Sequence, residues 1–209
     1  MKNAIKLSAL YNVVQPFREL LLLKRWLGTG KVVTPPQVVK RAILFSLARD
    51  RGIQVLVETG TYLGDTLACG LAAFREVHSI EVEPLIHARA VRIFGDRPGA
   101  NLHLGDSGEL LPEILSQLNE PAVFWLDGHF SGHITGRGNE DTPVEKELQA
   151  VLQSPFNHVA VIDDAREFGA NPSYPTLAHM EAIKKQLRPD YAFFVVADLI
   201  VVAPVWTVS

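Results

Sequence analysis

Residues 53–66 of the 209-residue chain read IQVLVETGTYLGDT, and this stretch decides the fold class. Its apolar run, Ile53–Val57, predicts a buried strand, and the glycine-bearing turn after it opens a helix. Four later apolar runs show the same sequence of strand, turn and helical spacing: Val77–Val82, Leu102–Leu104, Val123–Leu126 and Val159–Ile162. This alternation predicts an α/β fold, a doubly wound and mostly parallel sheet with helices on both faces.

The C-terminal part of the chain departs from this alternation. The runs Tyr191–Val196 and Leu199–Val205 are separated only by Ala197-Asp198, which favours an antiparallel hairpin over another helical crossover. Pro204, near the end of the second run, suits an edge strand. Together with the five earlier runs, this predicts a sheet of seven strands.

Residues 1–51 have helical character and predict an N-terminal helical cap, while residues 52–209 predict one compact domain. The cap is expected to be interrupted at Pro16 and broken at Thr34-Pro35-Pro36. Its apolar face suits either a homodimer contact or a lid over a site. Further along the chain, Thr142 and Glu145 predict a capping box at the start of a helix over 143–152.

Composition excludes several classes of protein. There are 20 Lys and Arg residues against 23 Asp and Glu residues, so nucleic acid is not expected as an electrostatic partner. Cys69 is the only cysteine, which excludes an intramolecular disulfide and a cysteine zinc site and favours a reducing, cytoplasmic location. The most apolar N-terminal run, Leu20–Leu23, is far shorter than the roughly 20 residues that a membrane span needs.

The turn after the first strand is the first candidate binding element. Gly60 and Gly64 would let the backbone approach a ligand closely. A dinucleotide fingerprint would require glycine where the chain has Tyr62 and Asp65, so a nicotinamide cofactor is not favoured. Asp65 at the helix start would repel a pyrophosphate and tolerate a ligand that carries an ammonium group.

Polar residues also follow the second and third strands. Glu81 ends the second strand about 20 residues beyond the glycine turn, where an acidic side chain can accept hydrogen bonds from both ribose hydroxyls. Glu83 suits the start of the next helix. Asp106 and Ser107 follow the third strand, and either residue could cap the next helix or reach a ligand's base.

Three carboxylates follow the fourth and fifth strands. Asp127, Asp163 and Asp164 should emerge at one edge of the sheet, where like charges would destabilise one another unless a cation lies among them. Such hard oxygen ligands suit a divalent ion such as Mg²⁺. His129 is placed to act as a general base, whereas pairing with His133 as metal ligands would need a helix that the nearby glycines disfavour.

These motifs resemble, in order, those of class I S-adenosylmethionine-dependent methyltransferases. The resembling segments are Val57–Thr66, Ser79–Pro84, Leu104–Ser107, Val123–Asp127 and Ile162–Asp164. The magnesium-dependent O-methyltransferases, of the catechol type and of antibiotic sugar pathways, look most similar. The resemblance implies a Rossmann-like methyltransferase fold over roughly residues 53–165.

The resemblance also implies a role for each matching residue. Ten residues would contact the cofactor: Glu58, Gly60, Thr61, Tyr62, Gly64 and Thr66 around its methionine part, Glu81 at the ribose, Asp106 and Ser107 at the adenine, and Asp127. The metal would be bound by Asp127, Asp163 and Asp164.

Two positions depart from the catechol type. Phe130 stands where that type has a lysine base, so His129, at the position of an acidic residue in the sugar enzymes, becomes the candidate base. Asp127 is the second expected catalytic residue. Asp164 stands where the catechol type has asparagine.

The sequence therefore predicts a divalent-metal-dependent O-methyltransferase that acts on a vicinal diol of a small molecule, a sugar more than a phenol. Metal would hold two acceptor oxygens and lower the pKa of the attacking hydroxyl. Two alternatives stay open at this stage: a non-catalytic S-adenosylmethionine-binding module and a metal-dependent hydrolase on a similar sheet.

Overall fold

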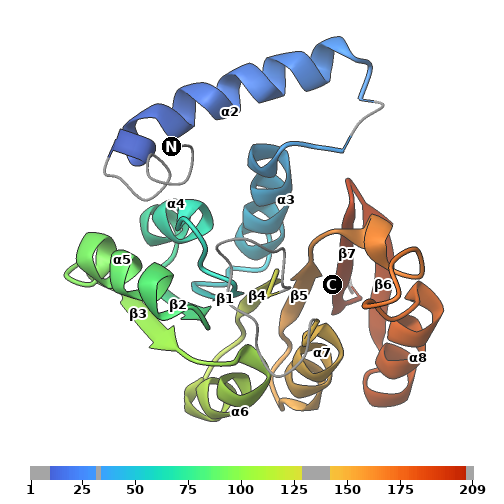
Figure 1. The fold of residues 1–209 in the computed structure, drawn as a ribbon. Helices are drawn as coiled ribbons and strands as arrows, with labels where there is room; N and C mark the ends of the chain where they lie inside the picture. The colour runs from blue at the N-terminus through green and yellow to red at the C-terminus, as the bar shows by residue number, and fades with distance from the viewer. Residues whose placement is uncertain (1–9, 32–33, 129–141, 206–209) are drawn as a thin grey trace.

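The structure, a computed structural model, describes residues 10–31, 34–128 and 142–205. Its centre is a seven-stranded sheet in the order β3-β2-β1-β4-β5-β7-β6 (Figure 1). The strands are β1 (Val55–Thr59), β2 (Glu76–Glu81), β3 (Ala100–Leu104), β4 (Val123–Leu126), β5 (Val159–Ile162), β6 (Tyr191–Val196) and β7 (Leu199–Pro204). Strands β1 to β5 pair in parallel, and β7 is antiparallel to both β5 and β6. The predicted fold class is confirmed.

Three helices pack on each face of the sheet (Figure 1). One face carries α3 (Gln37–Arg49), α4 (Asp65–Ala73) and α5 (Pro84–Phe94), and the other carries α6 (Ser107–Gln117), α7 (Val144–Gln153) and α8 (Leu177–Leu187). Successive residues of each strand point to opposite cores: Phe124 lies in the α6–α8 core, and its neighbour Trp125 lies in the α3–α5 core. The central strands β4 and β5 are apolar and buried at every position because helices cover both faces of the sheet.

Helix α2 (Leu10–Gly28) lies across the ends of α3 and α4, outside the layer of helices that packs on the sheet (Figure 1). The expected interruption at Pro16 is wrong, because α2 continues through it. Pro16 is exposed, so water can bond the carbonyl group that the proline leaves without an amide donor. Between 34 and 36 the chain is not helical, as predicted. In the described ranges, no helix is long and apolar enough to cross a membrane.

The hairpin is confirmed, but the position expected for Pro204 is wrong. Ala197 and Asp198 form a two-residue turn with φ values of 50° and 64°, the geometry of a type I′ turn. Strand β7 lies inside the sheet, between β5 and β6. Proline is tolerated there because the β5 pairing ends at Val202, so Pro204 pairs only with β6.

The capping box predicted at Thr142 does not form. Helix α7 begins at Val144, and the hydroxyl of Thr142 is buried without a hydrogen-bond partner in the part of the chain that is described. The Glu145 carboxylate instead lies 3.1 Å from the ring of His179 on the neighbouring helix α8. A tertiary contact has therefore replaced the local one.

Candidate functional site

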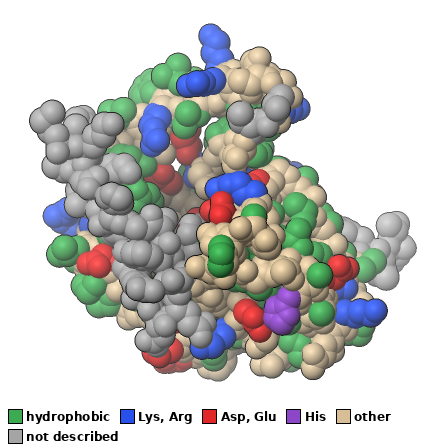
Figure 2. Space-filling model, turned by 45° about the vertical axis from the view of Figure 1, so that its right-hand side comes forward, with side chains coloured by type: hydrophobic (Ala, Val, Ile, Leu, Met, Phe, Trp, Pro, Cys, Tyr) green, Lys and Arg blue, Asp and Glu red, His purple; other side chains and the backbone are tan. Residues whose placement is uncertain are grey.

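A cavity of ≈ 410 Å³ lies at the carboxyl ends of β1, β4 and β5, beneath α2. In the space-filling view, a hollow opens near the middle of the face, with acidic side chains around it (Figure 2). The cavity is lined by residues of α2, by the turn after β1 and by the carboxylates that follow β4 and β5. Among the residues expected at the site, the lining includes Gly60, Thr61, Tyr62, Thr66, Asp127, Asp163 and Asp164. The topology thus brings most of the expected residues to one cavity.

The two glycines of the β1 turn have packing reasons for being glycine. At Gly60, φ is +85°, and a Cβ atom would lie 2.6 Å from the backbone oxygen of Asp127. At Gly64, φ is +79°, and a Cβ atom would lie 2.7 Å from the ring of Phe94. Both positions combine a left-handed backbone with a close neighbour, so any other residue would be strained. The absence of a side chain at Gly60 therefore lets the ends of β1 and β4 lie close together at the site.

Glu58, near the carboxyl end of β1 and two residues before Gly60 of the cavity lining, is a buried carboxyl group with 2% of its surface exposed. The Ser79 hydroxyl donates a hydrogen bond of 2.6 Å to its Oε1 atom, and Ser79 is also 2.6 Å from the Thr61 hydroxyl. Burial raises the pKa of Glu58 to about 8, the Ser79 bond opposes this rise, and the charge of Asp127 adds to it. Burial and the neighbouring carboxylates therefore favour the protonated form of Glu58.

Glu81, at the end of β2, is fixed by backbone amides. The amide of Tyr62 donates to Oε2 and that of Glu83 to Oε1, both at 2.9 Å. Burial raises the pKa of Glu81, and these amide bonds oppose the rise. Each carboxylate oxygen has a second lone pair, so the group can accept two further hydrogen bonds from a diol.

The acid at the start of α4 has a role that the sequence did not indicate. Tyr11 and Gln15 of α2 both donate to the Asp65 Oδ2 atom, at 3.0 and 2.8 Å. The Arg41 guanidinium of α3 forms an ion pair with Glu19 of α2. These three contacts hold α2 over the cavity.

Asp106 and Ser107 divide two roles between them. The Asp106 Oδ1 atom accepts a 2.8 Å bond from the Gly108 amide and caps α6. The side chain of Ser107 is buried near Gly128, the residue that follows Asp127. Asp106 is therefore the cap, as the sequence allowed for one of the two residues.

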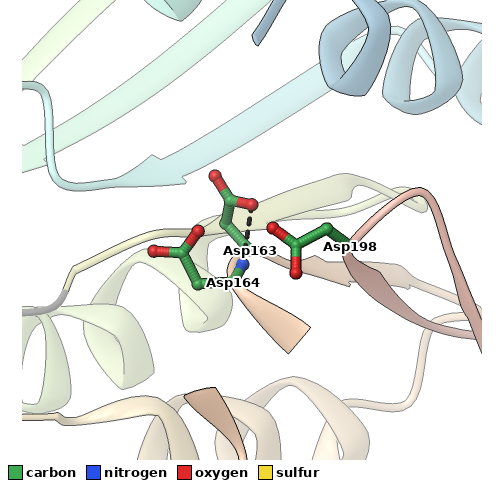
Figure 3. A group of neighbouring side chains, drawn as sticks. All are labelled: Asp163, Asp164 and Asp198. Atoms are coloured by element: carbon green, nitrogen blue, oxygen red, sulfur yellow. Dashed lines mark hydrogen bonds between the residues drawn. The ribbon is translucent and has the colours of Figure 1, made fainter. Parts of the chain in front are cut away.

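Asp163 and Asp164, directly after β5, meet Asp198 from the turn of the hairpin. Side-chain oxygens of these three residues lie within 4.8 Å of one another, and Figure 3 shows the three carboxylates side by side. Asp127 lines the same cavity, but among the described residues the group that could hold a metal contains Asp198 and not Asp127. The structure thus brings together two of the three expected metal ligands.

Two cations already lie on this group. The Lys40 ammonium of α3 bonds Asp163, lies 2.8 Å from Asp198 and is 3.5 Å from Asp164. Arg166 pairs with Asp164 at 2.8 Å and with Asp198. Burial disfavours the Lys40 charge, but the attraction of Asp163 and the hydrogen bonds outweigh it and raise the pKa of Lys40.

Sequence reasoning missed Lys40, although the sequence carries a signal for it. Lys40, Leu44 and Ala48 recur at helical spacing and are all buried on the inner face of α3. A lysine at such a position is almost never fully buried unless it is paired. The signal indicates a buried ion pair but not the identity of its partners.

Glu147 was also missed. This α7 residue lies on the apolar face beside Val144 and Leu148, and 1% of its surface is exposed. Burial raises its pKa to about 7, and hydrogen bonds from Ser107 and Thr59 oppose the rise. A carboxyl group on the apolar face of a helix was the available signal.

His129 and Phe130, and with them the expected base, lie outside the described residues. The same is true of His133.

No protein-family model matches the sequence, and the search of curated proteins found no match. Similar solved structures are methyltransferases. SAH-bound PaMTH1 from Podospora anserina covers 88% of this chain and 87% of its own, with 14% identity and a TM-score of 0.55. The O-methyltransferase TomG from Streptomyces achromogenes, involved in tomaymycin synthesis and bound to SAM, covers 79% of each chain, with 20% identity and a TM-score of 0.53. The N-methyltransferase NodS from Bradyrhizobium japonicum WM9 covers 80% of this chain and 96% of its own, with 13% identity and a TM-score of 0.52. At these identities the likeness establishes the Rossmann-like methyltransferase fold.

Proposed function

We propose that the protein is an S-adenosylmethionine-dependent O-methyltransferase acting on a small molecule. The observation that carries the proposal is the pair of buried acids at the ends of neighbouring strands, Glu58 and Glu81. Glu58 offers a buried carboxyl group to a cationic ligand, and Glu81 offers two fixed oxygens to a diol. S-adenosylmethionine carries an ammonium, a sulfonium and a ribose diol, so its chemistry matches these groups in order along the sheet.

In this proposal, the other cofactor contacts are the ones expected from the sequence. The turn Gly60–Thr66 borders the methionine part, Asp106 and Ser107 border the adenine, and Asp127 is a further contact. Helix α2 acts as a cap, because Tyr11, Gln15 and other α2 residues line the cavity. A cytoplasmic location and a homodimer stay predictions.

The bound cofactor supplies a methyl group on a positively charged sulfur, which leaves as a neutral thioether when an oxygen attacks. The task of the protein is to align that oxygen and remove its proton. His129 takes the proton, and Asp127 lies at the end of β4, beside the cavity, to orient the reacting groups. The cap excludes water from the cavity.

The acceptor is proposed to be a sugar or a similarly polar hydroxyl compound. The cavity lining supports this, since Gln15, Arg18, Gln37 and Arg166 are among its residues. Amide and guanidinium groups donate hydrogen bonds to hydroxyl oxygens.

The sequence also predicted a divalent ion that chelates a vicinal diol, bound by Asp127, Asp163 and Asp164. Such a site needs carboxylates with free oxygen atoms for the metal. The described residues do not fit this requirement, because Lys40 and Arg166 already neutralise Asp163 and Asp164. The reaction proposed for this protein therefore uses no metal.

Calorimetric titration of S-adenosylmethionine tests the proposal, with Glu81→Gln as the variant and Glu83→Gln as its matched control. Glu83 is two residues further along the chain and caps α5 at the surface. Loss of a charged hydrogen-bond acceptor should weaken binding by about 10- to 100-fold in Glu81→Gln, while Glu83→Gln should bind like the wild type.

If the wild type does not bind S-adenosylmethionine, the proposal is wrong. If it binds the cofactor but methylates no member of a broad panel of sugars and phenols, a non-catalytic binding module is favoured.

A further inference from the structure

We infer that the Lys40 ammonium is the resident cation of the Asp163–Asp164–Asp198 group and takes the place of a divalent metal. The inference deepens the proposed function and rests on it only for the identity of the reaction. Which cation the three aspartates bind can be tested without any methyl transfer.

The geometry of Lys40 is that of a bound ion. An ammonium group has three N–H donors, and Lys40 meets three carboxylates, those of Asp163, Asp164 and Asp198. Lys40 is 1% exposed, so water does not compete for these bonds. A protein cation thus lies where the three negative charges converge, which is the position a metal would need.

Asp163 has little capacity left for a metal. Its Oδ1 atom accepts from Lys40 and, at 2.7 Å, from the Asp164 amide, and its Oδ2 atom accepts at 2.9 Å from Gln37. Gln37 and Lys40 lie one turn apart on α3, so the same helix holds both oxygens. Both lone pairs of Oδ1 are used, so a metal could reach this carboxylate only through the second lone pair of Oδ2 unless it displaced Lys40.

The net charge of the group also disfavours a bound metal. The three carboxylates carry three negative charges, and Lys40 and Arg166 return two positive ones. Adding a divalent ion would place it against two cations at short range, where repulsion is strong. With Lys40 removed, the same carboxylates would keep Arg166 as their only described cation and would suit a hard divalent ion.

The inference changes what the acceptor must be. Chelation by a metal requires two neighbouring oxygens on the acceptor, whereas a buried ammonium does not chelate. A single hydroxyl then suffices, and its deprotonation depends on the base alone. Lys40 is a positioning residue in this account, because it acts by fixing the two carboxylates at the end of β5.

The test is direct Mn²⁺ binding, measured by electron paramagnetic resonance on the wild type, Lys40→Met, Lys40→Ala and the control Lys185→Ala. Lys185 is an exposed lysine on α8. Met keeps the apolar stem of lysine, so it guards against loss of folding. We expect Lys40→Met to bind Mn²⁺ at least about tenfold more tightly than the wild type or Lys185→Ala, and Mn²⁺ to raise its Tm by about 3 °C or more.

Tight Mn²⁺ binding by the wild type that disappears in Asp163→Asn would overturn the inference. A folded Lys40→Met protein that gains no Mn²⁺ affinity would overturn it as well. If neither Lys40 variant folds, the wild-type titration still decides: no tight Mn²⁺ binding supports the inference. Failure to bind S-adenosylmethionine would refute the proposed function and leave this result unchanged.

Discussion

Cofactor binding should be linked to the release of a proton from Glu58. In the free protein, burial raises the pKa of this carboxyl group to about 8, so about one tenth of the molecules carry the charged form at pH 7. The ammonium and sulfonium groups of S-adenosylmethionine favour the carboxylate. Ligand binding must therefore remove the proton below pH 8, at a cost of about 1.4 kcal/mol at pH 7.

The sign and size of the effect follow from this pKa. Because the bound state prefers the ionised group, affinity rises with pH below 8 and levels off above it. With full ionisation in the complex, the dissociation constant should fall about 25-fold between pH 6 and pH 7.5, or about 1.9 kcal/mol. The upper limit stays at pH 7.5 because α-amino groups, including that of the ligand, titrate near 8.

Calorimetry in two buffers of different ionisation enthalpy measures both quantities. At pH 6.5 we expect about one proton released for each cofactor bound in the wild type. The Glu58→Gln variant should show a much flatter pH profile and a smaller proton release, and the Glu83→Gln control should behave like the wild type. A pH-independent dissociation constant in the wild type, or an unchanged slope in Glu58→Gln, would refute the reasoning.

Two further predictions concern stability. Gly60→Ala places a Cβ atom 2.6 Å from the Asp127 carbonyl oxygen at a φ of +85°, and should cost about 3 kcal/mol in urea unfolding and abolish cofactor binding. Gly52→Ala, at a φ of +64° with no atom within 4 Å, should cost only about 1 kcal/mol and keep binding; equal losses would contradict the steric argument. Burial lowers the pKa of His158 to about 4, below the value of about 6.5 in the unfolded chain, so its stabilising contribution is complete above pH 6.5 and is lost as pH falls towards 4. Urea unfolding at pH 7 and pH 4.5 should show about 2.4 kcal/mol of this loss in the wild type and not in His158→Gln. An identical loss in both proteins would assign the effect to other groups.

The strands and the site edge were predictable because their signals are local. Apolar runs such as Val123–Leu126 and Val159–Ile162 coincide with β4 and β5, because strands covered by helices on both faces are mostly apolar. The first strand begins and ends two residues later than predicted, at Val55–Thr59. Glu58 and Thr59 are polar and look like turn residues, but the sheet buries them both.

Local chemistry was a poor guide where a tertiary contact competed with it. Thr142 has the sequence of an N-cap, yet its hydroxyl bonds nothing in the described structure, and Glu145 contacts His179 of another helix. Pro204 reads as an edge residue, yet it lies in an inner strand beyond the reach of β5. The residues next to Thr142 and Pro204 do not decide either structure. A short stretch of sequence around them therefore cannot predict it.

The sequence by itself determined the α/β fold, the turn after β1 and the acids that follow the strands, because apolar periodicity and strand ends are properties of adjacent residues. Only the tertiary structure decided which charges meet. Lys40 is separated by 123 residues from Asp163 and by 158 from Asp198, and these contacts turn an expected metal site into a site that holds an ammonium group. Electrostatic attraction and hydrogen bonding depend on distance in space, and distance along the chain carries no information about it.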